Sequence, residues 1–377
     1  MLDPDELNIV GDKVAAVYQQ IEAEMIAELA RACAEGERMS QRVLLDIAML
    51  SQANAAKLRE IIEKHREEVD KSILDTAQHY LAVSDAADIA ILHGAAKFPD
   101  KVQATVKGLK AWTERLDLEM PIAAQRLYTQ SVAQSAVKLG TGRISADEAM
   151  REAVRTMADS GISIVQYSTS GKRAYSMTTE AAVRNQVRVQ MTRASQEMTM
   201  ERIRESGAGL VEVSSHVGAR PSHAEWQGRV YSLNGPVTIG GVYYPDYETS
   251  CHVGDPVDGI FGYNCRHSVM PYVHGTPRTF DPNPEHTSGL SNDEYYKLTQ
   301  EQRARERGIR AAKRRVKAAE AVMDVNPTDA AQAELGHSKE LLKSRQASMR
   351  EFIKQANSMA KPGTQVLVRE PEREWIG

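Results

Sequence analysis

The middle of the chain reads Ser214-Ser-His-Val-Gly-Ala-Arg-Pro-Ser-His-Ala-Glu-Trp-Gln-Gly-Arg-Val-Tyr-Ser232, and it continues, after a hairpin, to Tyr263-Asn-Cys-Arg-His267. Glycine, proline, tyrosine and histidine are dense in this part, and turn dipeptides separate its short apolar stretches. Residues 210–214 alternate between apolar and polar side chains as a strand does, and residues 229–233 and 237–244 resemble further short strands. The pattern predicts a small α+β module with short strands and long loops.

The region before this module has the apolar spacing of helices. Apolar residues in segment 7–29 recur every three or four positions, which places them on one helix face, and Asp3 and Pro4 suit the N-cap and the first helical position. Similar faces recur at 43–58, 61–81 and 122–139, with breaks expected near Gly36, 94–99 and Pro121. We therefore expect a mainly helical N-terminal region, which is a plain bundle, an arm that docks on other subunits, or both.

Two further helices are expected between this region and the module. Ser145-Ala-Asp-Glu148 has the form of a capping box and opens the first helix. A loop at 168–173 follows, and a second helix starts at Thr178 or Thr179. Glu205-Ser-Gly207 ends that helix, because glycine suits the position just past a helix end.

Helices are also expected after the module. Ser291-Asn-Asp-Glu294 is another capping box, from which a long charged helix runs toward Met323. Pro327 interrupts it, and a second helix covers about 328–359. The predicted fold is therefore α+β, with a helical N-terminal region at 1–139, an α+β core at 140–289 and a charged helical C-terminal region with a tail at 290–377.

Composition narrows the classes of function. The net charge is −4 and the isoelectric point is about 6.2, so any contact with nucleic acid needs a local basic patch. Three cysteines, an odd and low number, argue against a disulfide framework and favour a reducing compartment, and we interpret Cys33 as a small core residue. No apolar run approaches a membrane span, and the acidic start does not resemble a signal peptide. We expect no membrane partner and synthesis in the cytoplasm.

Several uncommon residues of the middle segment agree in order and spacing with one known family. The segment has the form H-x-x-x-R-P-x-H-x-x-W-Q-G, and an N-C-R-H element follows it. In these motifs the chain resembles the phage minor capsid protein 2 family and, more distantly, the Mu-type minor head proteins. The residues that carry this signature are His216, Arg220, His223, Trp226, Gly228, Asn264, Cys265 and His267.

The resemblance implies a structural role in the virion of a tailed bacteriophage, with no catalytic residue. It implies a place in the head near the portal vertex, reached after synthesis in the host cytoplasm. The partners that it implies are the portal protein and the major capsid protein or other head subunits. Packaged double-stranded DNA is a further candidate partner.

The histidines and cysteines of the motif permit two structural interpretations. His216, His223, Cys265 and His267 carry the imidazole and thiolate groups that zinc prefers, and Cys251 and His252 lie nearby in the sequence. The alternative, which we prefer, is a buried hydrogen-bond network in which His216, Arg220 and Asn264 bridge the loops. Zinc is thus a candidate cofactor and no cofactor is firmly predicted.

The same residues also permit an enzyme. His216 and His223 have the chemistry of an acid–base pair, and Arg220 or Arg266 would steady a phosphate, as in a nuclease-like phosphodiesterase packaged in the head. No nucleophile elbow or P-loop accompanies them. We therefore predict no enzyme, keep a zinc-stabilised DNA-binding module as a third hypothesis, and interpret Trp226 as a packing anchor.

A run of cations marks the long helix that follows the module. Its members are Arg303, Arg305, Arg307, Arg310, Lys313, Arg314, Arg315 and Lys317, and Ile309, Ala312 and Val316 form a thin apolar stripe beside them. One interpretation is a solvated helix face with local ion pairs. The other is a contact with packaged DNA, or with an acidic surface of a partner, which would be insensitive to base sequence and sensitive to salt.

Overall fold

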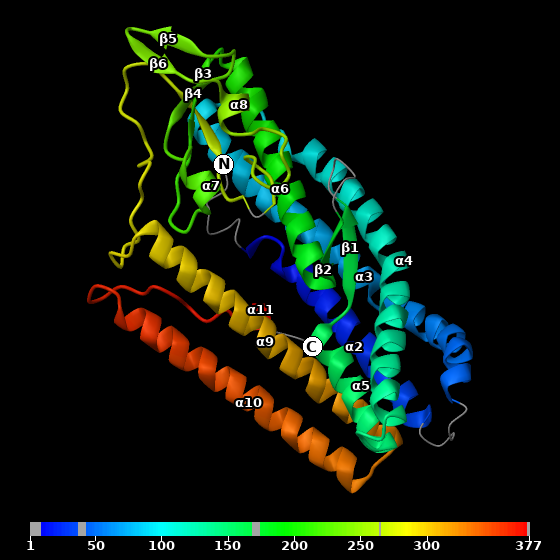
Figure 1. Ribbon diagram of the computed structural model, residues 1–377. Coiled ribbons are helices and arrows are strands. Elements are labelled where there is room, and N and C mark those ends of the chain that lie inside the picture. Colours follow the sequence, from blue (N-terminus) through cyan, green and yellow to red (C-terminus); the bar gives the residue numbers. More distant parts are fainter. Residues whose placement is uncertain (1–8, 37–42, 168–173, 264, 375–377) are drawn as a thin grey trace.

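The structure is a computed structural model, and it describes residues 9–36, 43–167, 174–263 and 265–374. Long helices dominate these ranges, and a small sheet-bearing part lies at one end (Figure 1). The predicted cap at Asp3 and Pro4, the predicted loop at 168–173 and Asn264 lie outside the described residues.

In the helical body, α6 (Thr179–Glu205) packs against α2 (Asp12–Gly36), α3 (Val43–Leu92) and α4 (Phe98–Gly140). α5 (Ala146–Ser160) packs against α4 and α2. Ile21, Met25, Leu81, Val187 and Met198 are among the fully buried side chains of the core of this body. The expected periodic faces of this region therefore meet in one interior.

The break expected at Pro121 is wrong, because α4 continues through it to Gly140. A proline inside a helix removes one backbone hydrogen bond and costs about 3 kcal/mol. Pro121 is buried in the body, and its neighbours Met120 and Ala124 are buried core residues, so the packing of this face offsets that cost. The break expected at 94–99 is confirmed, since α3 ends at Leu92 and α4 begins at Phe98.

Three strands were not expected from the sequence pattern. β1 (Ser163–Tyr167) and β2 (Ala174–Thr178) form an antiparallel pair beside α6, where only a loop was expected. β7 (Val269–Tyr272) adds a strand to the small sheet. These strands are four or five residues long, which is too short for a periodic pattern to distinguish them from loop.

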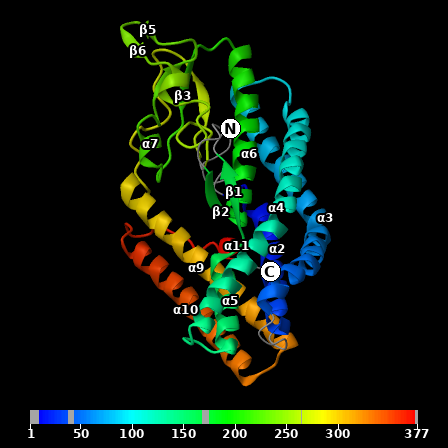
Figure 2. The same cartoon turned by 45° about the vertical axis from the view of Figure 1, so that its right-hand side comes forward.

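The C-terminal helices form a hairpin along the body, with α10 outermost (Figure 1, Figure 2). α9 (Asn292–Val325) begins at the predicted capping box, where the Ser291 hydroxyl accepts from the backbone of Glu294 and the Glu294 carboxylate accepts from the backbone of Ser291. α10 (Asp329–Ser358) is capped by Thr328, and the chain then returns along α9 to the short helix α11 (Pro371–Glu374). Phe352, Met349 and Ile309 are buried between the two long helices.

The small sheet-bearing part, which we call the hub, comprises residues 207–283. Its sheet is antiparallel with the order β4–β3–β7, where β3 is Leu210–Val213 and β4 is Val230–Ser232. β5 (Val237–Ile239) and β6 (Val242–Tyr244) form a separate hairpin at the far end of the molecule (Figure 1, Figure 2). Two short helices, α7 (Pro221–Ala224) and α8 (Tyr247–Ser250), complete the hub, and the predicted α+β fold is thereby confirmed.

The division into three domains stays a prediction. Its boundaries at 139 and 289 lie next to the end of α4 and the start of α9. Elements from all three regions nevertheless pack together, because α9 lies against both α2 and α5. α6 connects the parts further, since Met198 is buried in the core of the body and Ile203 in the core of the hub.

Candidate functional site

Three signature side chains converge in the interior of the hub. His223 comes from α7, and Cys265 and His267 come from the segment that leads into β7. All three are buried, and one ligand atom of each lies within 4.8 Å of the others. The Cys265 sulfur and His267 Nδ1 are 3.6 Å apart, so alternate residues of this extended segment do face one site.

Gln227 sets the orientation of this group, and the sequence analysis did not single it out. Its Oε1 accepts a hydrogen bond from His267 Nε2 at 3.1 Å and another from the backbone N–H of His216 at 3.2 Å. Because an amide oxygen only accepts, His267 carries its proton on Nε2 and turns an unprotonated Nδ1 toward Cys265. The W-Q-G part of the motif contained the signal, but a glutamine has no chemistry of its own that would have identified it.

The imidazoles of His216, His223 and His267 are neutral at pH 7. Burial lowers the pKa of His216 and of His223 to about 3, and Arg266 and Arg220 respectively add to the effect. Burial also holds the pKa of His267 well below its ordinary value. A neutral imidazole has a nitrogen lone pair that can bind a metal ion. The same lone pair can instead accept a hydrogen bond, so the neutral form fits both interpretations.

His216 lies beside the group of three and outside it. Its ring centroid is 4.5 Å from that of His267, and its Nδ1 bonds to the carbonyl of Val217 at 3.1 Å. Its ring nitrogens do not belong to the set of ligand atoms within 4.8 Å. The structure therefore brings three of the four candidate zinc ligands together.

Arg220 bridges loops, as the network interpretation expects. Its guanidinium donates to the carbonyl of Val257 at 2.6 Å and to the carbonyl of Tyr263. Both acceptors belong to the long loop that follows α8. The arginine thus holds that loop against α7 through charge-assisted hydrogen bonds.

Trp226 and Gly228 pack the hub from the other side. The buried Trp226 ring lies 4.6 Å from the His223 ring and 4.7 Å from the His267 ring, between centroids, which is the environment of a packing anchor. Gly228 has a φ of 62°, and a Cβ there would lie 2.5 Å from the backbone nitrogen of Pro282. Only glycine combines this backbone conformation with so close an approach.

The segment that approaches Gly228 is held by a buried carboxylate. Glu212 of β3 accepts hydrogen bonds from the backbone N–H groups of Thr279 at 2.9 Å and Phe280 at 2.7 Å. Asn292, the first residue of α9, accepts from the backbone of Gly218 and Ala219 and so joins the motif loop to the body. Through these contacts, β3 is joined to the segment at 279–280 and the motif loop is joined to α9.

The acid–base interpretation finds no support in this geometry. Of the expected pair His216 and His223, His223 is buried with the Trp226 ring against its own, whereas His216 is half-buried. A polynucleotide does not reach the His223 ring without rearrangement of the hub. Arg220 is also occupied by two backbone carbonyls and does not point a free guanidinium toward a phosphate.

The cations of α9 divide into two groups. Arg310 and Arg314 are buried, where Arg310 Nε lies 2.6 Å from Glu180 and Arg314 Nη1 lies 3.5 Å from Glu22. Arg305 bonds to Glu301 and Ser348, and Arg315 bonds to Asp159. The expectation of a solvated or DNA-binding face is thus wrong for Arg310 and Arg314, because their carboxylate partners come from distant helices of the body. Among the described residues, Arg303, Arg307, Lys313 and Lys317 have no ion pair within 4.0 Å.

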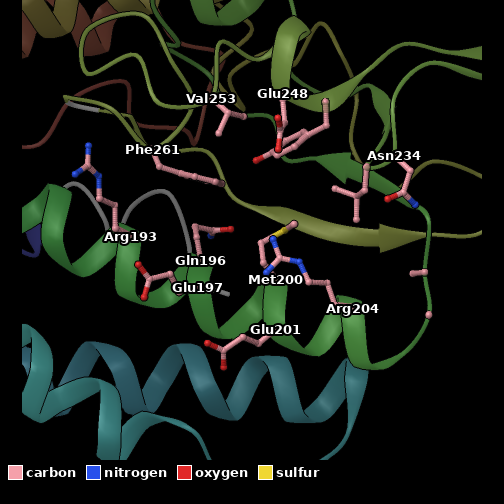
Figure 3. A pocket seen from close by; sticks show the side chains of 14 residues that line it. Arg193, Gln196, Glu197, Met200, Glu201, Arg204, Asn234, Glu248, Val253 and Phe261 are labelled. Carbon is pink, nitrogen blue, oxygen red and sulfur yellow. The ribbon is translucent and has the colours of Figure 1, made fainter. Parts of the chain in front are cut away.

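A cavity of about 590 Å³ lies between α6 and the loops of the hub (Figure 3). Gln196, Met200 and Arg204 of α6 line one wall, and Val253 and Phe261 line the other. Within the described part of the chain, Gln196 Oε1 and the Tyr247 hydroxyl of this wall are buried and have no hydrogen-bond partner. Of the signature residues that the structure describes, none lines this cavity, so it is separate from the histidine and cysteine group.

Comparison with known proteins identifies similar sequences. The family model described as phage minor capsid protein 2 matches residues 2–354. A protein named "Structural protein" from Lactococcus phage LL-H is 24% identical over 205 residues, which are 54% of this chain and 53% of that protein, so the match spans about half the length of each. No solved structure matches the chain. None of the helices in the described ranges is both long and apolar enough to cross a membrane.

Proposed function

The chain belongs to the phage minor capsid protein 2 family, and on this premise we propose that it is a minor structural protein of a tailed-phage head. The observation that carries the proposal is the family match over residues 2–354, which includes the body and the hub together. The similar phage protein named as structural agrees with it. The chain resides in the virion, at the head near the portal vertex, where the portal protein and the major capsid protein or other head subunits are its partners.

The β5–β6 hairpin offers a surface for such a partner. Ile239, Val242 and Tyr243 are exposed there, with 47% of Val242 and 64% of Tyr243 accessible. The hairpin is held to the rest of the hub where the Tyr244 hydroxyl meets His274 Nδ1 at 2.8 Å. Apolar side chains gathered on a projecting and anchored hairpin favour contact with another protein, and a head subunit is the occupant that the family implies.

Part of α9 favours contact with packaged DNA. Arg307 is exposed on α9, and Arg303, Lys313 and Lys317 are half-buried there. Arg303 and Arg307 also line a cavity of about 230 Å³ whose other walls include Arg184, Arg188 and Arg373, together with Glu180 and Glu306. Because arginines outnumber carboxylates around this cavity, the cavity favours binding of a phosphate group. A contact of this kind does not depend on base sequence.

The test of this function is the composition of purified particles. Virions of the phage that encodes the chain are purified by density and their proteins quantified by mass spectrometry. We expect the chain at a small number of copies relative to the major capsid protein, and chemical cross-links between it and the portal protein. Absence of the chain from DNA-filled particles overturns the proposal, and cross-links to tail proteins alone overturn the placement at the portal.

A further inference from the structure

We propose that His223, Cys265 and His267 form a zinc site that joins α7 to the segment leading into β7. The three residues lie in the sealed interior of the hub and supply two imidazole nitrogens and one sulfur. This inference concerns the stability of the hub and does not depend on where the protein resides in the virion.

The distances fit a zinc ion. Zinc holds a thiolate sulfur at about 2.3 Å and an imidazole nitrogen at about 2.0 Å, so in tetrahedral geometry the two ligand atoms lie roughly 3.5 Å apart. Cys265 Sγ and His267 Nδ1 are 3.6 Å apart. The third ligand atom, from His223, lies within 4.8 Å of both.

The orientation of each ring also fits. Gln227 holds the proton of His267 on Nε2, so the lone pair of Nδ1 faces the site. His223 Nε2 is buried and has no hydrogen-bond partner among the described residues, and the bond that His223 makes with the backbone of Asp258 therefore uses Nδ1. A metal ion explains this unpartnered nitrogen, whereas a hydrogen-bond network leaves it unsatisfied at a cost of about 1–3 kcal/mol.

Burial raises the pKa of the Cys265 thiol, and the backbone N–H groups of His267 and Phe261, together with Arg220 and Arg266, oppose that rise. A bound metal ion supplies the positive charge that a buried thiolate needs. When the metal binds, the thiol releases its proton to solvent, while the two neutral imidazoles bind without losing one.

The ligand set selects the metal. One thiolate and two imidazoles are soft or borderline ligands that suit zinc, and no carboxylate belongs to the group, which disfavours calcium and magnesium. Three protein ligands leave a fourth tetrahedral position for a water molecule. His216 is the nearest further imidazole, 4.5 Å from His267 between ring centroids.

The test uses the full-length chain, purified without chelator and dialysed. Elemental analysis should find about one zinc ion per chain, because the proposed tetrahedral site binds a single ion. Replacement with Co²⁺ should give the d–d bands of tetrahedral cobalt and a thiolate-to-metal charge-transfer band. Wild-type protein that retains no metal and shows no cobalt bands overturns the proposal.

Matched cysteine variants locate the site. Cys265→Ser and His223→Gln should lose the metal and the cobalt bands. Cys251→Ser, which alters another buried cysteine of the same hub core, should keep both. Zinc retained equally by wild type and Cys265→Ser contradicts the assignment. If Cys265→Ser does not fold, the charge-transfer band of the wild type still reports whether sulfur binds the metal.

Discussion

Asp12 and Arg373 lie 361 positions apart in the chain, and Arg373 Nε donates to Asp12 Oδ2 at 3.0 Å. Arg184 of α6 bonds to the other oxygen of the same carboxylate. Asp12 begins α2 and Arg373 lies in α11, so one buried carboxylate joins α2, α6 and α11.

Replacement of Asp12 by asparagine should destabilise the protein in a pH-dependent way. Burial raises the pKa of Asp12, but Arg184 and Arg373 outweigh it, so the folded pKa lies below its ordinary value. A lowered pKa stabilises the fold above the unfolded value of about 3.9, and this stabilisation is lost as the pH falls through the folded pKa. At pH 7 we expect a loss of roughly 3 kcal/mol, because both arginines keep a further carboxylate partner.

Urea unfolding of wild type and Asp12→Asn at several pH values measures this effect. The difference between the two should shrink as the pH falls below about 4, where the unfolded chain binds a proton at this carboxylate, and it should vanish once the folded carboxylate is also protonated. The exposed Asp75 of α3 provides the control, and Asp75→Asn should change stability little at any pH. A difference that stays constant down to pH 2 contradicts the prediction.

Gly228→Ala should destabilise the hub more than an equivalent change elsewhere in it. Positive φ costs a residue with a Cβ about 1–2 kcal/mol, and the clash with the backbone of Asp281 and Pro282 adds to this, giving about 2–4 kcal/mol in total. Gly235 has a φ of 81° and open space around its Cβ position, so Gly235→Ala carries the conformational cost alone. Thermal unfolding of the two variants should separate the contributions, and equal losses would show that the close approach does not matter.

Arg307→Gln should weaken retention on duplex DNA if α9 meets packaged DNA. Removing one phosphate contact lowers the slope of log affinity against log salt by about 1. Arg143→Gln removes the same charge from an exposed position in the loop after α4 and serves as the control. Binding of labelled duplex DNA over a series of salt concentrations measures both, and identical slopes for the two variants would argue against a specific role of this helix face.

Polar replacement on the β5–β6 hairpin should reduce incorporation into virions. Val242→Ser with Tyr243→Ser removes two exposed apolar side chains, and the loss of one interface anchor of about 1.4 kcal/mol lowers occupancy about tenfold when binding is not saturated. Val137→Ser changes an apolar side chain that is 68% exposed on α4 and should have no effect. Complementation of a deletion phage, followed by quantification of the chain in particles, gives the result. Normal incorporation of the double variant would exclude the hairpin as the docking surface.

Local signals predicted much of the secondary structure. The capping box at Ser291 and Glu294 and the cap at Ser145 are formed as expected, because a cap depends on residues three positions apart. The helix end at Gly207 follows for the same reason. Pro121 was misjudged, because the energy that keeps α4 intact comes from packing against other helices and not from the residues next to the proline.

The sequence identified the residues of the candidate site, but it did not show how they are arranged in space. The motif identified His223, Cys265 and His267 as residues of interest, since imidazole and thiol groups have recognisable chemistry. Their convergence depends on how α7 meets the segment before β7, and so does the orienting role of Gln227. Neither follows from spacing along the chain.

By itself, the sequence determined helix starts such as the capping box at Ser291, helix ends such as that at Gly207, and the motifs by which the family is recognised, because these depend on neighbouring residues. Only the tertiary structure decided which of many similar arginines are buried and which remain available. Arg310 and Arg314 meet Glu180 and Glu22, whereas Arg307 on the same helix remains exposed. The physical reason is that a buried charge requires a partner, and the partners here come from helices brought together only when the body folds.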